Sequence, residues 1–124
     1  MEILIKTEKG SLRAEIIEDL NPQTAGAIIE SLPITGRANV WGDEIYFEIP
    51  VSLDEENSQQ EVEIGSMGYW PPGKALCLFF GRTPVSKTDK PRAYSPVNLF
   101  GKITDDLKIL KSIRDGDQIE ITHK

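Results

Sequence analysis

The chain has 124 residues, with 14 basic and 20 acidic side chains and a formal net charge of −6 at neutral pH. This length predicts one domain that spans residues 1–124. The single cysteine, Cys77, excludes an internal disulfide and a multi-cysteine metal site, and the single histidine, His123, leaves histidine-based catalysis poorly supplied. We therefore expect neither a bound metal nor a cofactor.

The first quarter of the chain predicts a β-hairpin followed by a helix. Apolar residues occupy positions 3, 5, 12, 14 and 16 around a glycine-bearing turn, as in two half-buried strands. Asn21 is a favourable N-cap, and Pro22 suits the first helical position. Pro33 ends the helix, one face of which carries four apolar residues: Ala25, Ile28, Ile29 and Leu32.

The middle of the chain returns to strands. Between residues 44 and 49 an apolar face alternates with a second face that carries Glu44, Tyr46 and Glu48. Pro50 ends this strand. Residues 54–60 have no apolar periodicity and predict an exposed loop, after which residues 62–64 resume a strand.

A buried strand lies between two segments that are rich in glycine and proline. Residues 65–73 hold too many of both for regular structure. Leu76–Phe80 is a continuous apolar run, typical of a central strand that is buried on both faces. Residues 81–96 contain three prolines and predict a long loop, followed by a strand at Val97–Ile103.

The end of the chain predicts a short helix and a closing strand. Asp105 can cap a helix in which Leu107 and Leu110 face inward, and Ile119 and Ile121 alternate in the last strand. Many short strands with few helices favour a mainly β protein. We expect its sheet to close into a barrel, with two short helices covering the ends.

Charge and hydropathy limit the possible partners. Residues 1–73 carry 14 acidic and 4 basic side chains, whereas residues 74–114 carry 9 basic and 3 acidic ones. This asymmetry can orient a charged partner, or it can reflect two solvated loops of opposite sign. An acidic chain is repelled by phosphate backbones, so we expect no nucleic-acid partner. The longest apolar run is too short to span a membrane and no secretory signal is visible, so we expect a cytoplasmic protein.

Several strings in the sequence resemble a known family. The order of elements resembles a cyclophilin, as do the strings at residues 22–25, 73–80 and 97–103. Three further strings resemble the small prokaryotic cyclophilin-like proteins, which are stand-alone domains of about this length with no settled function: Trp41–Phe47, Gly68–Gly73 and Phe80–Pro84. The resemblance covers essentially the whole chain. It implies a closed eight-stranded cyclophilin-like barrel with two short helices.

The resemblance also implies a groove whose catalytic residues have changed. Cyclophilins isomerise the bond before proline, against a barrier of roughly 18–20 kcal/mol, with an arginine that donates to the prolyl nitrogen. The arginine position falls here at Asp43 or Glu44, whose ionised carboxylates only accept hydrogen bonds. The pocket phenylalanine position falls at Cys77, with Phe79 able to face the same side, and the histidine position falls at or beside Val97.

Five residues are therefore candidates for ligand binding: Glu44, Tyr46, Trp70, Phe79 and Val97. The rings of Tyr46 and Trp70 can stack on a proline or aromatic ring, and Glu44 with Asp43 can bind a cation or a basic peptide. The alternatives are that Glu44 faces solvent beside a turn at residues 42–43 and that Trp70 only covers a barrel end. Cys77 is expected to be an inert small hydrophobe.

Three functions are open at this point. We prefer a domain that binds an extended or proline-containing peptide, or a small molecule, without the usual catalytic arginine. The alternative is an atypical peptidyl-prolyl cis-trans isomerase, in which Arg82, beside Thr83 and Pro84, is a candidate substitute donor. A third hypothesis is an enzyme that uses Asp43 or Glu44 as an acid or base, which requires a raised carboxylate pKa inside a cleft.

Overall fold

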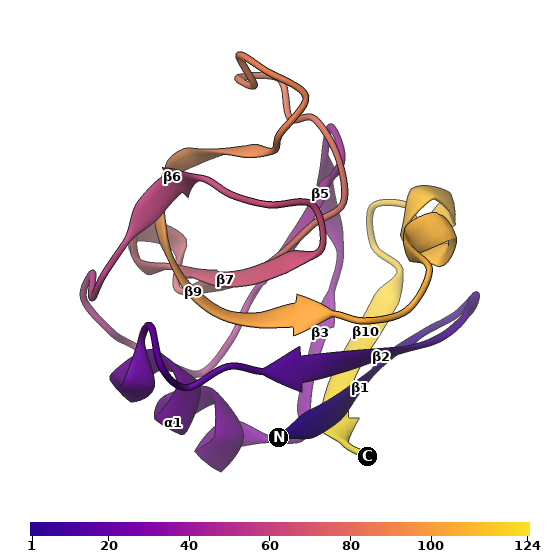
Figure 1. Cartoon of the computed structure of the whole chain (residues 1–124). Coiled ribbons are helices and arrows are strands. Elements are labelled where there is room, and N and C mark those ends of the chain that lie inside the picture. The colour runs from indigo at the N-terminus through magenta and orange to yellow at the C-terminus, as the bar shows by residue number, and fades with distance from the viewer.

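The computed structural model describes residues 1–124 and contains ten strands and three helical segments (Figure 1). The strands are β1 (Glu2–Thr7), β2 (Gly10–Ile16), β3 (Ile34–Arg37), β4 (Asn39–Trp41), β5 (Glu44–Glu48), β6 (Gln59–Glu61), β7 (Ser66–Trp70), β8 (Ala75–Phe79), β9 (Arg92–Ile103) and β10 (Gln118–His123). The helical segments are α1 (Pro22–Ser31) and two short 3-10 helices, η1 (Pro71–Gly73) and η2 (Leu107–Ser112). The protein is mainly β, as predicted.

The strands form one curved antiparallel sheet, but hydrogen bonds do not close it. Neighbouring strands follow the order β3-β10-β1-β2-β9-β7-β8-β5-β4, and β6 pairs with β9 beside this path. The two edges, β3 and β4, are separated in the chain only by Ala38. The chain changes partner there, because β3 pairs with β10 whereas β4 pairs with β5. The structure therefore differs from the expected closed eight-stranded barrel in both strand number and closure.

The sheet curves round on itself (Figure 1), and side chains from its strands form the main hydrophobic core. Alternate residues of β1 are fully buried, among them Ile3 and Ile5, because successive side chains of a strand point to opposite faces. Helix α1 adds Ala25 and Ile28 to the core and ends just before Pro33. The hairpin and the helix predicted for the first quarter of the chain are confirmed.

A distant side chain, rather than Asn21, caps helix α1. Asn21 occupies the N-cap position but makes no capping bond, because its Oδ1 instead accepts the backbone N–H of Asn57 at 2.7 Å. The carboxylate of Glu56 instead accepts the backbone N–H groups of Gln23 and Thr24, each at 3.1 Å. The loop that follows β5 is thereby held against the start of α1.

Two segments predicted to be irregular are strands. β7 lies between β8 and β9, and Trp70 is its only residue that is not buried. Gly68 permits close packing there, since a Cβ would lie only 3.1 Å from the side chain of Val97. β9 begins at Arg92 rather than at Val97, and it includes Pro96 where the register with β6 is irregular. Proline is tolerated at such a point because its missing N–H interrupts no regular ladder.

The structure also differs slightly from the sequence predictions in where a strand ends and in which residue caps the C-terminal helix. β6 ends at Glu61, so the strand expected at residues 62–64 lies slightly earlier. The C-terminal helix is a 3-10 helix capped by Asp106, whose side chain accepts a backbone N–H. Asp105, the expected cap, is instead held by the guanidinium of Arg13 at 2.8 Å. No helix is long and apolar enough to cross a bilayer.

Candidate functional site

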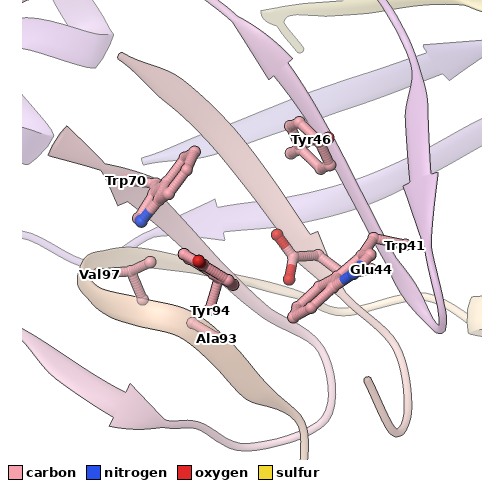
Figure 2. A pocket seen from close by; sticks show the side chains of 7 residues that line it. All are labelled: Trp41, Glu44, Tyr46, Trp70, Ala93, Tyr94 and Val97. Carbon is pink, nitrogen blue, oxygen red and sulfur yellow. The ribbon is translucent and has the colours of Figure 1, made fainter. Parts of the chain in front are cut away.

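A pocket of about 190 Å³ opens on the face of β5 that points away from the main core. Ile45 and Phe47 enter the core, so Glu44 and Tyr46 project from the opposite face. Strands β4, β5, β7 and β9 supply the lining residues, whose side chains surround a common space (Figure 2): Trp41, Glu44, Tyr46, Trp70, Ala93, Tyr94 and Val97.

A second, smaller hydrophobic cluster lies beneath this pocket. It consists of Val62, Cys77, Phe79, Ala93 and Val97, with Tyr46 and Trp70 packed against it. Phe79 is fully buried and pairs with Glu44 across β5 and β8. The pocket therefore has a closed apolar base, which supports the side chains that line it.

Four aromatic rings surround the pocket. The ring of Tyr94 meets those of Trp41 and Trp70 edge to face, with a centroid separation of 6.1 Å in both pairs. Trp70 Nε1 donates a hydrogen bond of 2.6 Å to Ser95 Oγ. The rings come from separate strands, and because the pairs are edge to face rather than stacked, the four rings enclose a common space that a ligand can enter.

Gly73 fixes the position of the Trp70 ring. A Cβ at Gly73 would lie 2.5 Å from Cζ3 and 2.6 Å from Cε3 of that ring, which is closer than carbon atoms can approach. The indole therefore rests directly on the backbone of η1. The string Gly68–Gly73 thus places both the ring and the residue that makes room for it.

A tight turn brings Trp41 beside Glu44. Gly42 has a φ of 60°, a conformation that favours glycine, and a Cβ there would lie 2.8 Å from Cδ of Pro84. The Asp43 N–H donates to the Arg82 carbonyl at 2.8 Å. Trp41 and Glu44 are consequently paired across the β4–β5 hairpin.

The carboxyl group of Glu44 is buried, and one of its two oxygen atoms has no hydrogen-bonding partner. The residue is only 5% exposed, and its Oε1 atom makes no hydrogen bond. Burial raises the pKa of this carboxyl to about 7, and the opposing effect of a hydrogen bond with the Cys77 thiol is smaller. Figure 2 shows the carboxyl group directed into the space between the rings. The interpretation that Glu44 faces solvent is therefore wrong.

Cys77 shares this environment from below. Burial raises the pKa of its thiol well above the ordinary value, and the neighbouring Glu44 carboxylate raises it further. A thiol of this kind is a poor nucleophile because little thiolate is present at neutral pH. The structure supports the expectation that Cys77 is an inert small hydrophobe.

The structure brings together four of the five residues that the sequence proposed for ligand binding. Glu44, Tyr46, Trp70 and Val97 line the pocket, whereas Phe79 lies beneath it. Arg82 is exposed and does not line the pocket.

The sequence analysis missed three lining residues: Trp41, Ala93 and Tyr94. Trp41 belongs to a string that supported the resemblance, so a signal for it existed. Ala93 and Tyr94 fall in the segment that the sequence predicts to be a loop, whereas the structure places them in β9, on the wall of the pocket.

The fold and the sequence can now be compared with known proteins. A family model described as cyclophilin-like matches residues 1–122. The chain belongs to the cyclophilin-like family. No curated protein sequence matches it.

Three solved structures share the fold. The hypothetical protein AF2241 from Archaeoglobus fulgidus is 43% identical, with a TM-score of 0.84 over 100% of this chain and 95% of that one. McbB in complex with tryptophan is 14% identical, with a TM-score of 0.73 over 98% of this chain and 44% of that one. A cyclophilin-type peptidyl-prolyl cis-trans isomerase of Cryptosporidium parvum, solved in the presence of the dipeptide Ala-Pro, is 12% identical, with a TM-score of 0.66 over 100% and 99% of the two chains.

Proposed function

We propose that this cyclophilin-like domain binds a small molecule or one side chain of an extended peptide in the aromatic pocket, without the isomerase chemistry of an arginine donor. The observation that carries the proposal is the pocket itself, in which four aromatic rings surround the Glu44 carboxyl group, whose Oε1 atom has no hydrogen-bonding partner: Trp41, Tyr46, Trp70 and Tyr94. A concave, largely aromatic site with one placed polar group is typical of ligand-binding pockets.

Two structural neighbours lend support through the ligands in their descriptions. One was solved with the dipeptide Ala-Pro and the other with tryptophan, so related folds accommodate small ligands of peptide or amino-acid size. The present pocket differs from a site that uses an arginine donor, because no basic side chain lines it. Arg82, the substitute donor suggested by the sequence, is exposed outside the lining.

NMR exchange spectroscopy with labelled Xaa-Pro peptides and with tryptophan tests this proposal. We expect the indole resonances of Trp41 and Trp70 to shift on titration, with no increase in the rate of prolyl exchange. Tyr94→Ala should weaken binding, whereas Ile64→Ala, which removes an exposed hydrophobic side chain outside the pocket, should leave it unchanged. Cis–trans exchange of the peptides well above the spontaneous rate, in the presence of the protein at pH 8, would contradict a function limited to binding.

The raised pKa of Glu44 favours a second candidate, an atypical prolyl isomerase. A protonated carboxyl group has an O–H donor, which an ionised one lacks, and could donate to the prolyl nitrogen as the amide twists. Catalysis of this kind should be present near pH 5 and lost near pH 8. Glu44→Ala, which removes the donor without supplying another, should reduce the rate at pH 5, and an unchanged rate in this variant would exclude the carboxyl group as the donor.

A further inference from the structure

We propose that the pocket binds an alkylammonium group, and an N-methylated one in preference, with Glu44 as the counter-charge and the four aromatic rings as walls. This inference rests on the proposed function, because it specifies the chemical class of the ligand for the same pocket. It concerns free amines and ammonium-bearing side chains alike, since both present the same head group.

Oε1 of the buried Glu44 carboxyl group has no partner within the chain. A buried carboxylate is costly unless an opposite charge or hydrogen bonds compensate for the lost hydration. No lysine or arginine lines the pocket, and Oε1 has no partner within the chain. A cationic ligand would supply the compensating charge that the protein does not.

The aromatic residues that line the pocket also favour a cationic ligand. A cation is attracted to the negative face of an aromatic ring, and tryptophan binds it best. Trp41, Tyr46, Trp70 and Tyr94 approach the same space from four different strands, so a cation beside Glu44 can contact several rings at once. Cages of several aromatic rings recognise quaternary ammonium groups.

The polar groups of the pocket favour a methylated ammonium over a primary ammonium or a divalent metal ion. A primary ammonium carries three N–H donors, whereas Glu44 is the only carboxylate that lines the pocket. A methylated ammonium has fewer donors or none, and its methyl groups suit the apolar base formed by Ala93 and Val97. Calcium and magnesium require six or more oxygen ligands, and one carboxylate cannot provide them.

The protonation of Glu44 should respond to such a ligand. The other titratable groups that face it are Cys77 on β8, Tyr46 on β5 and Tyr94 on β9, none of which carries a positive charge. A bound cation favours the ionised carboxylate, so binding should release a proton near neutral pH and should weaken as the pH falls.

NMR titration with choline and with its neutral isostere 3,3-dimethylbutan-1-ol tests the inference. The two probes have the same shape, so the comparison isolates the charge. We expect choline to shift the indole resonances of Trp41 and Trp70 and to bind roughly tenfold or more tightly than the alcohol. Glu44→Gln should abolish this preference, and Glu48→Gln, an exposed residue on the same strand outside the pocket, should retain it.

Two further comparisons identify the kind of ligand and show whether the inference alone or also the proposed function has failed. Trimethyllysine is tested both as a free amino acid and within a short peptide, which distinguishes a small ligand from a protein side chain. If either binds more tightly than its unmethylated form, the inference is supported. Equal binding of choline and its isostere, or an unchanged preference in Glu44→Gln, would overturn the inference but leave a ligand-binding pocket. If Xaa-Pro peptides and tryptophan also leave the indole resonances unshifted, the proposed function fails with it.

Discussion

The two faces of the paired strands β5 and β8 are built differently. On the inner face, Ile45, Phe47 and Leu76 are enclosed by the main core. On the outer face, Oε1 of the buried Glu44 carboxyl group has no hydrogen-bonding partner, and Tyr46 remains partly exposed. The same two strands therefore contribute to stability on one side and carry a locally unfavourable arrangement on the other. Such violations of the rules for stable packing are expected where a ligand completes the site.

The largest effect should come from truncation of the inner face. Phe47→Ala removes a fully enclosed ring and should lower the free energy of unfolding by about 3–5 kcal/mol. Tyr94→Ala removes a ring that is 69% exposed and should cost within about 1 kcal/mol. Urea unfolding of both variants measures the contrast. Equal losses would mean that the pocket rings belong to the stabilising core.

The next largest effect on stability concerns Glu44. At high pH its substitution by glutamine should stabilise the protein, whereas Phe47→Ala destabilises it. The raised pKa of Glu44 means that the folded protein holds a proton between the ordinary carboxyl pKa and about 7, where the unfolded chain does not. Stability from this group is fully present below the ordinary pKa and is lost as the pH rises through about 7. Relative to Glu44→Gln, the wild-type protein should lose up to about 3 kcal/mol between pH 4 and pH 8.

Unfolding by urea at several pH values, compared between wild type and Glu44→Gln, measures this difference. Glu48→Gln provides the matched control, because Glu48 is exposed on the same strand. Parallel pH profiles for wild type and Glu44→Gln would show that Glu44 ionises as readily as a solvated carboxyl group, and the contrast between the two faces would disappear.

The inner face was predictable from the sequence to a greater extent than the outer one. Period-two alternation identified the inward residues of β1, β2, β5 and β10, because burial in a core follows directly from hydrophobic pattern. β7 was missed since Gly68 reads as a breaker, although close packing against Val97 of β9 requires a residue without a side chain there. The break in the sheet between β3 and β4 was not predicted, because the change of pairing partner at Ala38 depends on contacts distant in sequence.

The candidate site was likewise predicted only in part from the sequence. Glu44, Tyr46 and Trp70 were found through strand alternation and family resemblance. Burial of Glu44 could not be predicted, because a glutamate that alternates with apolar residues normally faces water. Tyr94 was assigned to a loop for the same reason that β9 began too late: three prolines mask a strand that tolerates Pro96 only at an irregular register.

A third prediction concerns the support of the outer face. Gly73→Ala should displace the Trp70 ring, since the new Cβ would overlap its six-membered ring. We expect a loss of stability of about 1–3 kcal/mol, typical of overpacking, together with weaker ligand binding. Gly26→Ala, where a Cβ meets nothing within 4 Å, is the matched control. Tryptophan fluorescence and the choline titration would reveal the displacement, and an unchanged indole environment in Gly73→Ala would contradict it.

The smallest effect should come from the ion pair between Arg13 and Asp105, which belongs to neither face. Hydrogen bonds from the guanidinium and backbone N–H of Arg13 lower the pKa of Asp105 to about 2. Its contribution to stability is therefore present above the ordinary carboxyl pKa and is lost as the pH falls towards about 2. Asp105→Asn should lower the Tm slightly at neutral pH, since exposed pairs contribute little, and the difference from wild type should vanish in strong acid. Choline binding should be unaffected, because the pair lies outside the pocket lining. The pH dependence of stability at this exposed pair would thus run opposite to that at Glu44: Arg13 stabilises Asp105 in its ionised form, whereas no basic side chain lines the pocket to do the same for Glu44.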